Sequence, residues 1–465
     1  MADDWTTIGG IAEVFDGPHA TPKKIDRGPY FLSISSLDQG KLDLSKSAHI
    51  SEEQYEKWTK RVTPQEGDVL FSYETRLGEA ALMPGGIKAC LGRRMGLLRP
   101  NRELVDPSYL LFAYLGPDFQ REIVARTNSG ATVDRIALKE LPSFPIRIPQ
   151  LQEQREVASV LSALDNKIEL NRQINTTLES MAQALFKSWF VDFDPVIDNA
   201  LAAGNPIPEP LQARAEKRAA LLAAASAAHT RSATPLQPLP ADLRALFPGS
   251  FVFNEEMGWV PEGWGISPIN LFGDVVCGKT PSKSKPEFYG DDVPFIKIPD
   301  MHQDMFVVDP GERLSLEGAN SQVKKMLPRG SVCVSCIATV GKVIVTIEPS
   351  QTNQQINSIV PRSEHHVPYL YFYMQTLNKR FHDLASGGSA TLNMNTSTFS
   401  KVSILNPSDG LLEYFYSRVK SEFEKIELNL KQSLTLSRLR DLLLPKLLAG
   451  QIQIPEAEKL AAEAV

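Results

Sequence analysis

The sequence has 465 residues, of which 42% are hydrophobic and 22% are charged, and its formal net charge is −6. This length predicts two to four domains, each with its own core, and the composition is that of an ordinary globular protein. No apolar run is long enough for a membrane span, the N-terminus lacks the features of a signal peptide, and the four cysteines fit a reducing compartment, so we expect a cytoplasmic protein. The acidic balance argues mildly against nucleic acid, although local basic patches are compatible with it.

Residues 1–150 predict a first globule that mixes strands and helices. The runs FLSI, VLFSY and FPIRI are β-branched or alternating, which is typical of strands, and YLLFAYLGPDFQREIVA predicts a helix. Lys23 and Lys24 lie in an early turn. Residues 88–102 hold five basic residues and no acidic one: Lys88, Arg93, Arg94, Arg99 and Arg102.

Residues 151–192 predict a first long helix. The segment 151–190 contains neither proline nor glycine, and its apolar residues recur with a 3-4 spacing, which is the pattern of a coiled-coil seam. The seam residues are Val157, Leu161, Leu164, Ile168, Leu178, Leu185 and Trp189.

Residues 193–257 change character and predict a linker. Their first half is rich in alanine, and their second half is rich in proline. We expect one short helix near 209–228 and a mostly irregular connection after it.

Residues 258–409 predict a second globule of the same kind. The runs PFIKI, SVCVSCIATV and KVIVTI predict strands, and YLYFYMQTLNKRFHDLA predicts a helix, so both globules belong to the α+β class. This globule also has basic loops: Lys279, Lys283 and Lys285 share one turn, and residues 318–347 hold Lys324, Lys325, Arg329 and Lys342 without an acidic residue.

Two apparent chemical motifs in this globule fail on their context, and the histidines of the whole chain offer no third. Residues 273–280 match the phosphate-binding pattern GxxxxGK[ST], but Pro268 precedes them and no helix pattern follows. Cys333 and Cys336 form a CxxC without a second ligand pair, so core packing is expected and no zinc site. The seven histidines form no metal-ligand pattern. We therefore expect no catalytic residue and no metal site.

Residues 410–450 predict a second long helix, followed by a tail at 451–465. The phrase KIELN stands at 167–171 and again at 425–429, 258 positions later (425 − 167). Further matches keep nearly the same offset in the same order, such as EGDVLFSYETRLGEA with RGSVCVSCIATVGKV. The chain is therefore interpreted as a duplication of a globule and its helix. Because neither apolar stripe can be left in water, the two helices are expected to pack on each other.

Asn171 and Asn429 occupy seam positions near the middle of the two helices. A polar residue in a seam weakens it but fixes its register. If the helices are antiparallel about a pseudo-twofold axis, both side chains approach that axis. An alternative, with both asparagines facing solvent, stays open.

The equivalent placement of basic loops in both globules favours DNA binding. Lysine and arginine can hold phosphates, while arginine, asparagine and glutamine can read base edges. The candidate DNA-contacting residues are Lys23, Lys24, Arg76, Arg93, Arg94 and Asn128 in the first globule, and Lys279, Lys283, Lys285, Lys342, Gln354, Gln355 and Asn393 in the second.

Four stretches carry a family resemblance. Residues 151–195 closely resemble the first long helix of the specificity subunits of type I restriction–modification systems. Residues 247–264 and 278–301 resemble the entry and the opening of the second target-recognition domain of that family, and residues 438–452 resemble the end of its second long helix. The resemblance extends over nearly the whole chain.

The resemblance implies two target-recognition domains, related by a pseudo-twofold axis and separated by two antiparallel helices that act as a spacer. Each domain would read half of a split target in double-stranded DNA. Two modification subunits would carry S-adenosylmethionine and methylate adenine, and restriction subunits would add cleavage that depends on ATP and Mg²⁺. This chain would bind no cofactor and catalyse neither reaction. A longer spacer helix should lengthen the gap in the target.

Two alternatives remain at this point. The chain could be a nucleotide-dependent nuclease or methyltransferase that acts alone, against which the failed motifs weigh. It could also be a coiled-coil scaffold that never touches DNA, against which the basic loops weigh.

Overall fold

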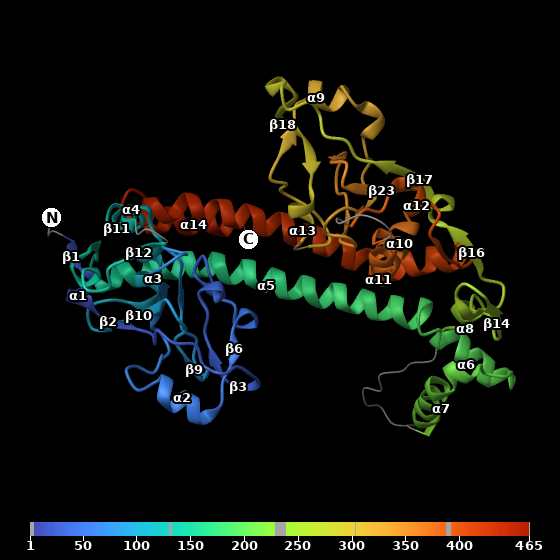
Figure 1. Cartoon of the computed structure of the whole chain (residues 1–465), viewed down its shortest axis with the longest axis horizontal. Helices are drawn as coiled ribbons and strands as arrows, with labels where there is room; N and C mark the ends of the chain where they lie inside the picture. Colours follow the sequence, from blue (N-terminus) through green and yellow to red (C-terminus); the bar gives the residue numbers. More distant parts are fainter. Residues whose placement is uncertain (1–3, 130–132, 228–238, 303, 387–391, 465) are drawn as a thin grey trace. The chain divides into compact units, whose positions relative to one another are not determined.

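The computed structural model describes residues 4–129, 133–227, 239–302, 304–386 and 392–464. The chain forms two compact units: residues 1–170 with 435–465, and residues 171–434. Figure 1 follows the elements from the blue N-terminal strands to the red C-terminal helices. Within the described ranges, no helix is both long and apolar enough to cross a membrane.

The first unit is built around a four-stranded antiparallel sheet of order β2-β10-β7-β8. A three-stranded sheet, β6-β3-β9, and three two-stranded pairs, β1-β13, β4-β5 and β11-β12, lie beside it in the described part of the unit. The strands are β1 (Trp5–Thr7), β2 (Ala12–Asp16), β3 (Ile25–Phe31), β4 (Leu37–Asp38), β5 (Lys41–Leu42), β6 (Ala48–His49), β7 (Val69–Ser72), β8 (Ala80–Leu82), β9 (Ala89–Cys90), β10 (Met95–Pro100), β11 (Thr127–Ser129), β12 (Asp134–Ile136) and β13 (Pro145–Arg147). The helices of this globule are α1 (Ile8–Ile11), α2 (Glu52–Trp58), α3 (Pro107–Leu115) and α4 (Pro117–Ala125).

The second unit repeats three of these sheets with the same strand order: β17-β23-β20-β21, then β19-β18-β22, then β16-β24. Its strands are β16 (Gly265–Pro268), β17 (Gly273–Cys277), β18 (Tyr289–Ile296), β19 (Arg313–Leu314), β20 (Val332–Ser335), β21 (Val343–Val345), β22 (Gln351–Thr352), β23 (Ile356–Pro361) and β24 (Ser403–Asn406). Its globule helices are α9 (Leu316–Asn320), α10 (His366–Thr376), α11 (Asn378–Ala385) and α12 (Thr396–Ser400). The register also repeats, because Met95 pairs with Ser72 and Ile356 pairs with Ser335. The internal duplication and the α+β class predicted from the sequence are confirmed.

The central strands β7 (VLFS) and β20 (VCVS) each have three apolar residues in a row because both faces of the sheet are covered. In β7, Val69 and Phe71 enter the core that α3 lines, while Leu70 enters a second cluster on the other face. In β20, Val332 and Val334 correspond to the first pair, and Cys333 enters the second cluster. The thiol of Cys333 is therefore a core group.

The two long helices are α5 (Leu151–Phe190) and α13 (Asp409–Leu448), each of 40 residues. Within the second unit they run antiparallel, because residue numbers rise along α5 as those of its contacts on α13 fall: Asn175 bonds the Ile426 carbonyl, and Phe186 packs on Phe415. Within the first unit, Leu161 and Leu164 share a core with Leu436 and Leu443.

Only part of the seam prediction holds in the C-terminal half of α5, where Trp189 is buried with 3% of its surface exposed. Leu178 and Leu185 are only partly buried, whereas Ala182 and Phe186 are fully buried. The ring of Phe186 lies 5.6 Å from that of Phe372 in α10, centroid to centroid. The helix therefore turns an aromatic face toward the second globule, and a seam shared by two helices alone does not describe it.

The expected linker at 193–257 is more ordered than its composition predicts. It contains α6 (Asp194–Ala203), α7 (Gln212–Ala227), α8 (Ala241–Arg244) and strand β14 (Phe251–Asn254), which pairs with β15 (Gly258–Pro261). Val196, Leu243 and Phe247 are buried in the core of the second unit. Arg214 and Arg218 on α7 pair with Asp194 and Asp198 on α6. The tail at 451–465 likewise contains α14 (Ile454–Ala464), whose Ala457 is fully buried.

Candidate nucleic-acid interface

In each globule, two segments meet at one corner. We call them the basic loop, which follows the first strand of the four-stranded sheet (residues 17–24 and 278–285), and the polar turn, which precedes the sheet's next strand (residues 93–94 and 354–355). The loop that follows β2 begins at Gly17, whose N–H donates to the Met95 carbonyl at 2.8 Å. The loop that follows β17 begins at Gly278, whose N–H donates to the Ile356 carbonyl at 3.0 Å. A Cβ atom on Gly278 would lie only 2.1 Å from the Asn353 carbonyl oxygen, so this close approach requires glycine.

The residues just before β10 and β23 occupy equivalent positions in this corner. Arg94 accepts a backbone hydrogen bond from Tyr73, and Gln355 accepts one from Cys336. Arg93 and Gln354 precede them. The structure thus places these two pairs of candidate residues at matching sites in two copies of one fold, as the sequence match of LGRRMGLLRP (from Leu91) with TNQQINSIVP (from Thr352) predicts.

A second matching feature is the turn between β7 and β8, and between β20 and β21. Thr75 and Ala338 have positive φ angles of 75° and 62°. Few non-glycine residues adopt this conformation, and such strain is often found at functional sites. Gly78 and Gly341 end the turns, and their carbonyls accept hydrogen bonds from the side chains of Gln120 and Asn378.

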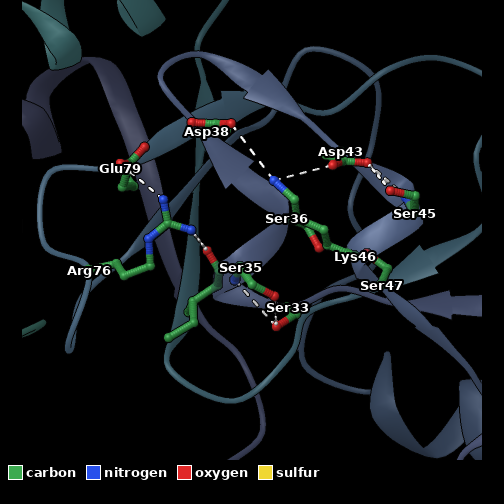
Figure 2. A network of polar contacts seen from close by, with 11 residues as sticks. Ser33, Ser35, Ser36, Asp38, Asp43, Ser45, Lys46, Ser47, Arg76 and Glu79 are labelled. Carbon is green, nitrogen blue, oxygen red and sulfur yellow. Dashed lines mark hydrogen bonds and ion pairs between the residues drawn. The ribbon is translucent and has the colours of Figure 1, made fainter. Parts of the chain in front are cut away.

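Arg76 lies in the first of these turns, inside a polar network (Figure 2). Its guanidinium donates to the Ile34 carbonyl at 3.1 Å and to Glu79 Oε1 at 3.2 Å. Figure 2 also shows Lys46 between Asp38 and Asp43 in the same network. Arg76 is therefore occupied by the protein's own acceptors, which weakens its candidacy as a base reader.

The basic run at 88–102 is largely neutralised by acids from elsewhere in the chain. Lys88 pairs with Glu52, and Arg99 pairs with the buried Asp68 at 2.7 Å. Hydrogen bonding to Asp68 raises the pKa of Arg99. Arg102 donates to a backbone carbonyl. Acids that are distant in sequence therefore neutralise part of this run, and its contact with DNA stays a prediction.

Arg93 and Arg94, which lie in that run, differ in their contacts: the Arg94 side chain is bonded to other described residues, and the Arg93 side chain is not. Arg94 has a positive φ of 70°, donates to Thr75 Oγ1 at 3.2 Å and lies 3.4 Å from Glu74. Arg93 is exposed, and its side chain has no hydrogen bond or ion pair within the described part of the chain.

Lys23 and Lys24 are exposed and likewise have no ion pair to described residues. Asn128 lies in β11 opposite Arg135, and its side chain is outside the described atoms. The Ala-Thr turns at 131–132 and 390–391, also considered from the sequence, lie outside the described residues.

In the second globule the candidate residues meet directly. Thr280 Oγ1 donates to Gln354 Oε1 at 2.7 Å, which joins the basic loop to the polar turn. Lys279 precedes this threonine; its carbonyl accepts from Gln322, and its side chain is exposed. Gln355 Oε1 accepts from Asn353, so Gln354 is the exposed member of the glutamine pair.

The remaining lysines of the loop are exposed. Lys283 has no ion pair to described residues, and the Lys285 ammonium lies over the Phe288 ring at 4.7 Å. A cation–π contact of this kind leaves the charge accessible to an anion.

Lys342 and Arg329 have surroundings that the sequence did not predict. Lys342 lines a pocket of about 270 Å³ together with Glu179 and Asp304. Desolvation raises the pKa of the Asp304 carboxyl, and the charge of Glu179 raises it further. Arg329 pairs with Glu427 on α13, so it is a structural cation. Asn393 is exposed, and its backbone forms an isolated antiparallel β-bridge with Ile337.

The two helix asparagines are buried and lie among α5–α13 contacts in the second unit. Asn171 Nδ2 donates to Gln432 Oε1 at 2.9 Å, and Asn429 Nδ2 donates to Asn175 Oδ1 at 2.8 Å. Asn175 was not singled out from the sequence, although it lies one helical turn after Asn171. The solvent-facing alternative does not describe these side chains, and their effect on register stays a prediction.

Two of the rejected motifs have ordinary structural roles. Residues 273–277 form strand β17, and the GKT sequence leads into a loop and a single 3-10 turn at Pro286–Phe288 in place of the α-helix that the motif needs. Cys333 and Cys336 are buried, and desolvation raises the pKa of each thiol to about 12. The histidines differ from expectation, because His365, His366 and Asp409 converge on one point.

Two copies of one α+β globule, each followed by a long helix and each with exposed polar and basic side chains at one corner, define a recognition protein. Comparisons identify the class. The model of the type I restriction modification DNA specificity domain matches residues 2–180 and 261–410. The chain is 43% identical over 371 residues to the type I restriction enzyme HindI specificity subunit of Haemophilus influenzae, across 77% of this chain and 80% of that one.

A more distant relative is the type I restriction enzyme MjaIX specificity subunit of Methanocaldococcus jannaschii, which is 21% identical over 447 residues, across 95% of this chain and 88% of that one. Among solved structures, the S subunit of a type I restriction–modification system from M. genitalium has a TM-score of 0.56 at 14% identity over 96% of both chains, which shows the shared fold.

The chain belongs to the family of type I restriction–modification specificity subunits. It is the DNA-recognition component of such a system, and its function is not catalytic. The comparisons support neither a stand-alone enzyme nor a scaffold that does not read DNA.

Proposed function

We propose that each globule reads one half of a split DNA target through the corner formed by its basic loop and its polar turn. The observation that carries this proposal is the matching position of Arg93 and Gln354. Both side chains are exposed. Each residue directly precedes one whose carbonyl accepts a backbone hydrogen bond from beyond the end of the neighbouring strand, namely Arg94 or Gln355. Arginine pairs best with guanine and glutamine with adenine, so the two globules would prefer different bases.

Phosphate anchoring is assigned to the exposed lysines of the same loops. Lys23 and Lys24 in the first globule, and Lys279 and Lys283 in the second, have no ion pair within the described residues. Such contacts carry no sequence information, but they position the reader and make affinity fall steeply with salt. The net charge of −6 makes tight binding by the isolated chain unfavourable, so partner subunits would supply part of the affinity.

The partners proposed for this chain are two modification subunits and restriction subunits. The modification subunits would carry S-adenosylmethionine and methylate adenine in the recognised target. The restriction subunits would use ATP and Mg²⁺ for cleavage, and the assembled complex would act in the cytoplasm. This chain would supply the target sequence and no cofactor.

DNA binding by the reconstituted complex tests the proposal. The chain is assembled with its modification subunits, and affinity for host DNA is measured against salt. The variant Lys279→Gln/Lys283→Gln should lower affinity and make the salt dependence shallower by about two charges. A control, Lys459→Gln, changes an exposed lysine of α14 that lies 4.0 Å from Glu463 and should leave both unchanged. Equal affinity of all three complexes, or a slope that does not change, would contradict the assignment.

A further inference from the structure

His365, His366 and Asp409 form a cluster in the second unit that the DNA-reading function does not use. Asp409 Oδ1 lies 2.9 Å from Nε2 of each histidine. The three ligand atoms lie within 4.8 Å of one another. The imidazoles are mostly buried, with 19% and 13% of their side chains exposed, whereas the carboxylate is 74% exposed and opens the cluster to solvent.

In the second globule the cluster connects the start of α10 to the start of α13. The first globule connects the equivalent helices, α3 and α5, without any histidine. Asp106 lies three residues before Tyr109, as His366 lies three residues before Tyr369. The Asp106 N–H donates to Gln154 Oε1 at 2.9 Å, and the Gln154 amide also bonds the carbonyls of Leu104 and Pro149. One buried amide therefore joins α3 to α5.

In the second globule the residue equivalent to Gln154 is Leu412, which cannot make those bonds. The connection between α10 and α13 is made by the two imidazoles and Asp409 instead. A structural link alone needs one hydrogen-bonding group, as the first globule shows. Two convergent imidazole nitrogens and a carboxylate supply more, namely the donor set that transition metals prefer.

We propose that His365, His366 and Asp409 bind one divalent transition-metal ion of the zinc class, which joins α10 to α13. Zinc lies about 2.0–2.2 Å from nitrogen and oxygen ligands, so tetrahedral ligand atoms are roughly 3.3 Å apart. The two histidine–aspartate separations of 2.9 Å must lengthen by about 0.4 Å to reach this spacing, and the two histidine nitrogens lie within 4.8 Å of each other. The fourth position is open to water on the exposed side of Asp409.

The surroundings of the rings favour metal binding at Nε2. His365 Nδ1 lies 2.7 Å from Ser363 Oγ, so a proton on Nδ1 has an acceptor, and Nε2 keeps its lone pair for the metal. Such outer hydrogen bonds orient metal-ligating histidines. His366 Nδ1 has no partner among the described residues, so its tautomer is set by the group that meets Nε2.

The charge balance makes Asp409 indispensable to this site. His366 begins α10 and Asp409 begins α13, and the positive end of a helix disfavours a cation. The negative charge of the Asp409 carboxylate offsets the partial positive charges at the N-termini of α10 and α13. Replacing it with the neutral Asp409→Asn, which keeps an acceptor oxygen for both rings, should retain the fold and abolish metal binding.

Equilibrium dialysis of the full chain with Zn²⁺ tests the proposal, with no affinity tag and in a Cys277→Ser background. Cys277 is the one described cysteine that is not fully buried, so its replacement removes the accessible thiol. One Zn²⁺ per chain is expected, with an accompanying rise in the midpoint of thermal unfolding. Asp409→Asn and His365→Gln/His366→Gln should lose both effects, and Ser363→Ala should weaken binding roughly tenfold.

The matched control is His19→Gln. His19 lies 3.4 Å from Asp16 and forms a histidine–carboxylate pair without a third ligand, so this variant should bind Zn²⁺ as the parent does. Mg²⁺ should neither compete nor stabilise, because it prefers oxygen ligands. The proposal is overturned if the parent binds no Zn²⁺, or if binding survives in Asp409→Asn or in the double histidine variant. None of these readouts depends on DNA recognition, so their failure is distinct from a failure of the proposed function.

Discussion

Asn429 Nδ2 donates a hydrogen bond of 2.8 Å to Asn175 Oδ1, between two antiparallel helices and away from solvent. Asn175 in turn donates to the Ile426 carbonyl at 3.5 Å. The Asn429 Oδ1 atom is buried and has no partner among the described residues. This pair therefore costs desolvation energy without full hydrogen bonding, which is the pattern of a residue that fixes register at the expense of stability.

Single and double leucine variants of Asn175 and Asn429 should separate the cost of burying two polar side chains from the gain of the hydrogen bond between them. Asn429→Leu alone leaves Asn175 Oδ1 buried without its donor and should destabilise the chain by about 1–3 kcal/mol. Asn175→Leu/Asn429→Leu removes both partners and should restore or raise stability, as measured by thermal unfolding. A double variant that is less stable than the single one would contradict this reading.

The sequence predicted the duplication and the long helices because these depend on repeated apolar patterns, which are local. It did not predict that Phe186 takes the buried position beside Leu185, because an aromatic core from α10 decides that choice. It also missed α6 and α14. Each of these helices has a proline near its start, which the first turn of a helix tolerates.

Gly78 should tolerate alanine less well than a glycine of similar conformation. Gly78 has a φ of +86°, and an added Cβ would lie 2.2 Å from Gln120 Oε1, so alanine strains the turn and displaces the amide that binds the Gly78 carbonyl. Gly86 has a φ of +75° with no atom near an added Cβ. Gly86→Ala should cost about 1 kcal/mol and Gly78→Ala about 2 kcal/mol in thermal unfolding. Equal costs would show that the amide contributes nothing.

The ion pair between Arg329 and Glu427 should make stability depend on pH. Desolvation raises the pKa of Glu427, but hydrogen bonds from Arg329 and Lys431 outweigh it, so the net pKa is lowered. The stabilisation is therefore present above the unfolded pKa, about 4.3, and is lost as pH falls through the lower folded value. Because Arg329 is 59% exposed, the pair contributes only about 1 kcal/mol.

Arg329→Gln should accordingly lower the unfolding midpoint at pH 7 and have a smaller effect below about pH 4. Lys324→Gln is the matched control, because Lys324 is exposed and has no ion pair to described residues. If Arg329→Gln lowers the unfolding midpoint by the same amount at pH 7 and below about pH 4, the ion pair does not make stability depend on pH.

Arg93 should control one base of one half-site. Arg93→Ala should cost about 1–3 kcal/mol in target binding and relax a single position in the half-site of the first globule. Arg93→Gln should shift that position from guanine toward adenine. Arg121→Ala, which changes a 78% exposed arginine paired with Asp118, should leave the target unchanged. Relaxation in both half-sites, or none, would contradict the assignment.

Residue type alone predicted this site incompletely. Basic character drew attention to the run at 88–102, but only three-dimensional structure shows that Glu52 and Asp68 neutralise Lys88 and Arg99. Arg93 and Gln354 were chosen for their chemistry, the sequence repeat already matched their positions, and the repeated sheet confirms that match. The cluster of His365, His366 and Asp409 was missed because Asp409 lies more than 40 residues away in sequence.

Methylation mapping of host DNA by single-molecule sequencing, with and without this gene, tests the central claim most directly. The account predicts a split motif of methylated adenines that disappears on deletion and returns when the gene is restored. An adenine methylation pattern that persists unchanged after deletion, while the modification subunits are still produced, would contradict the claim that this chain supplies the target sequence.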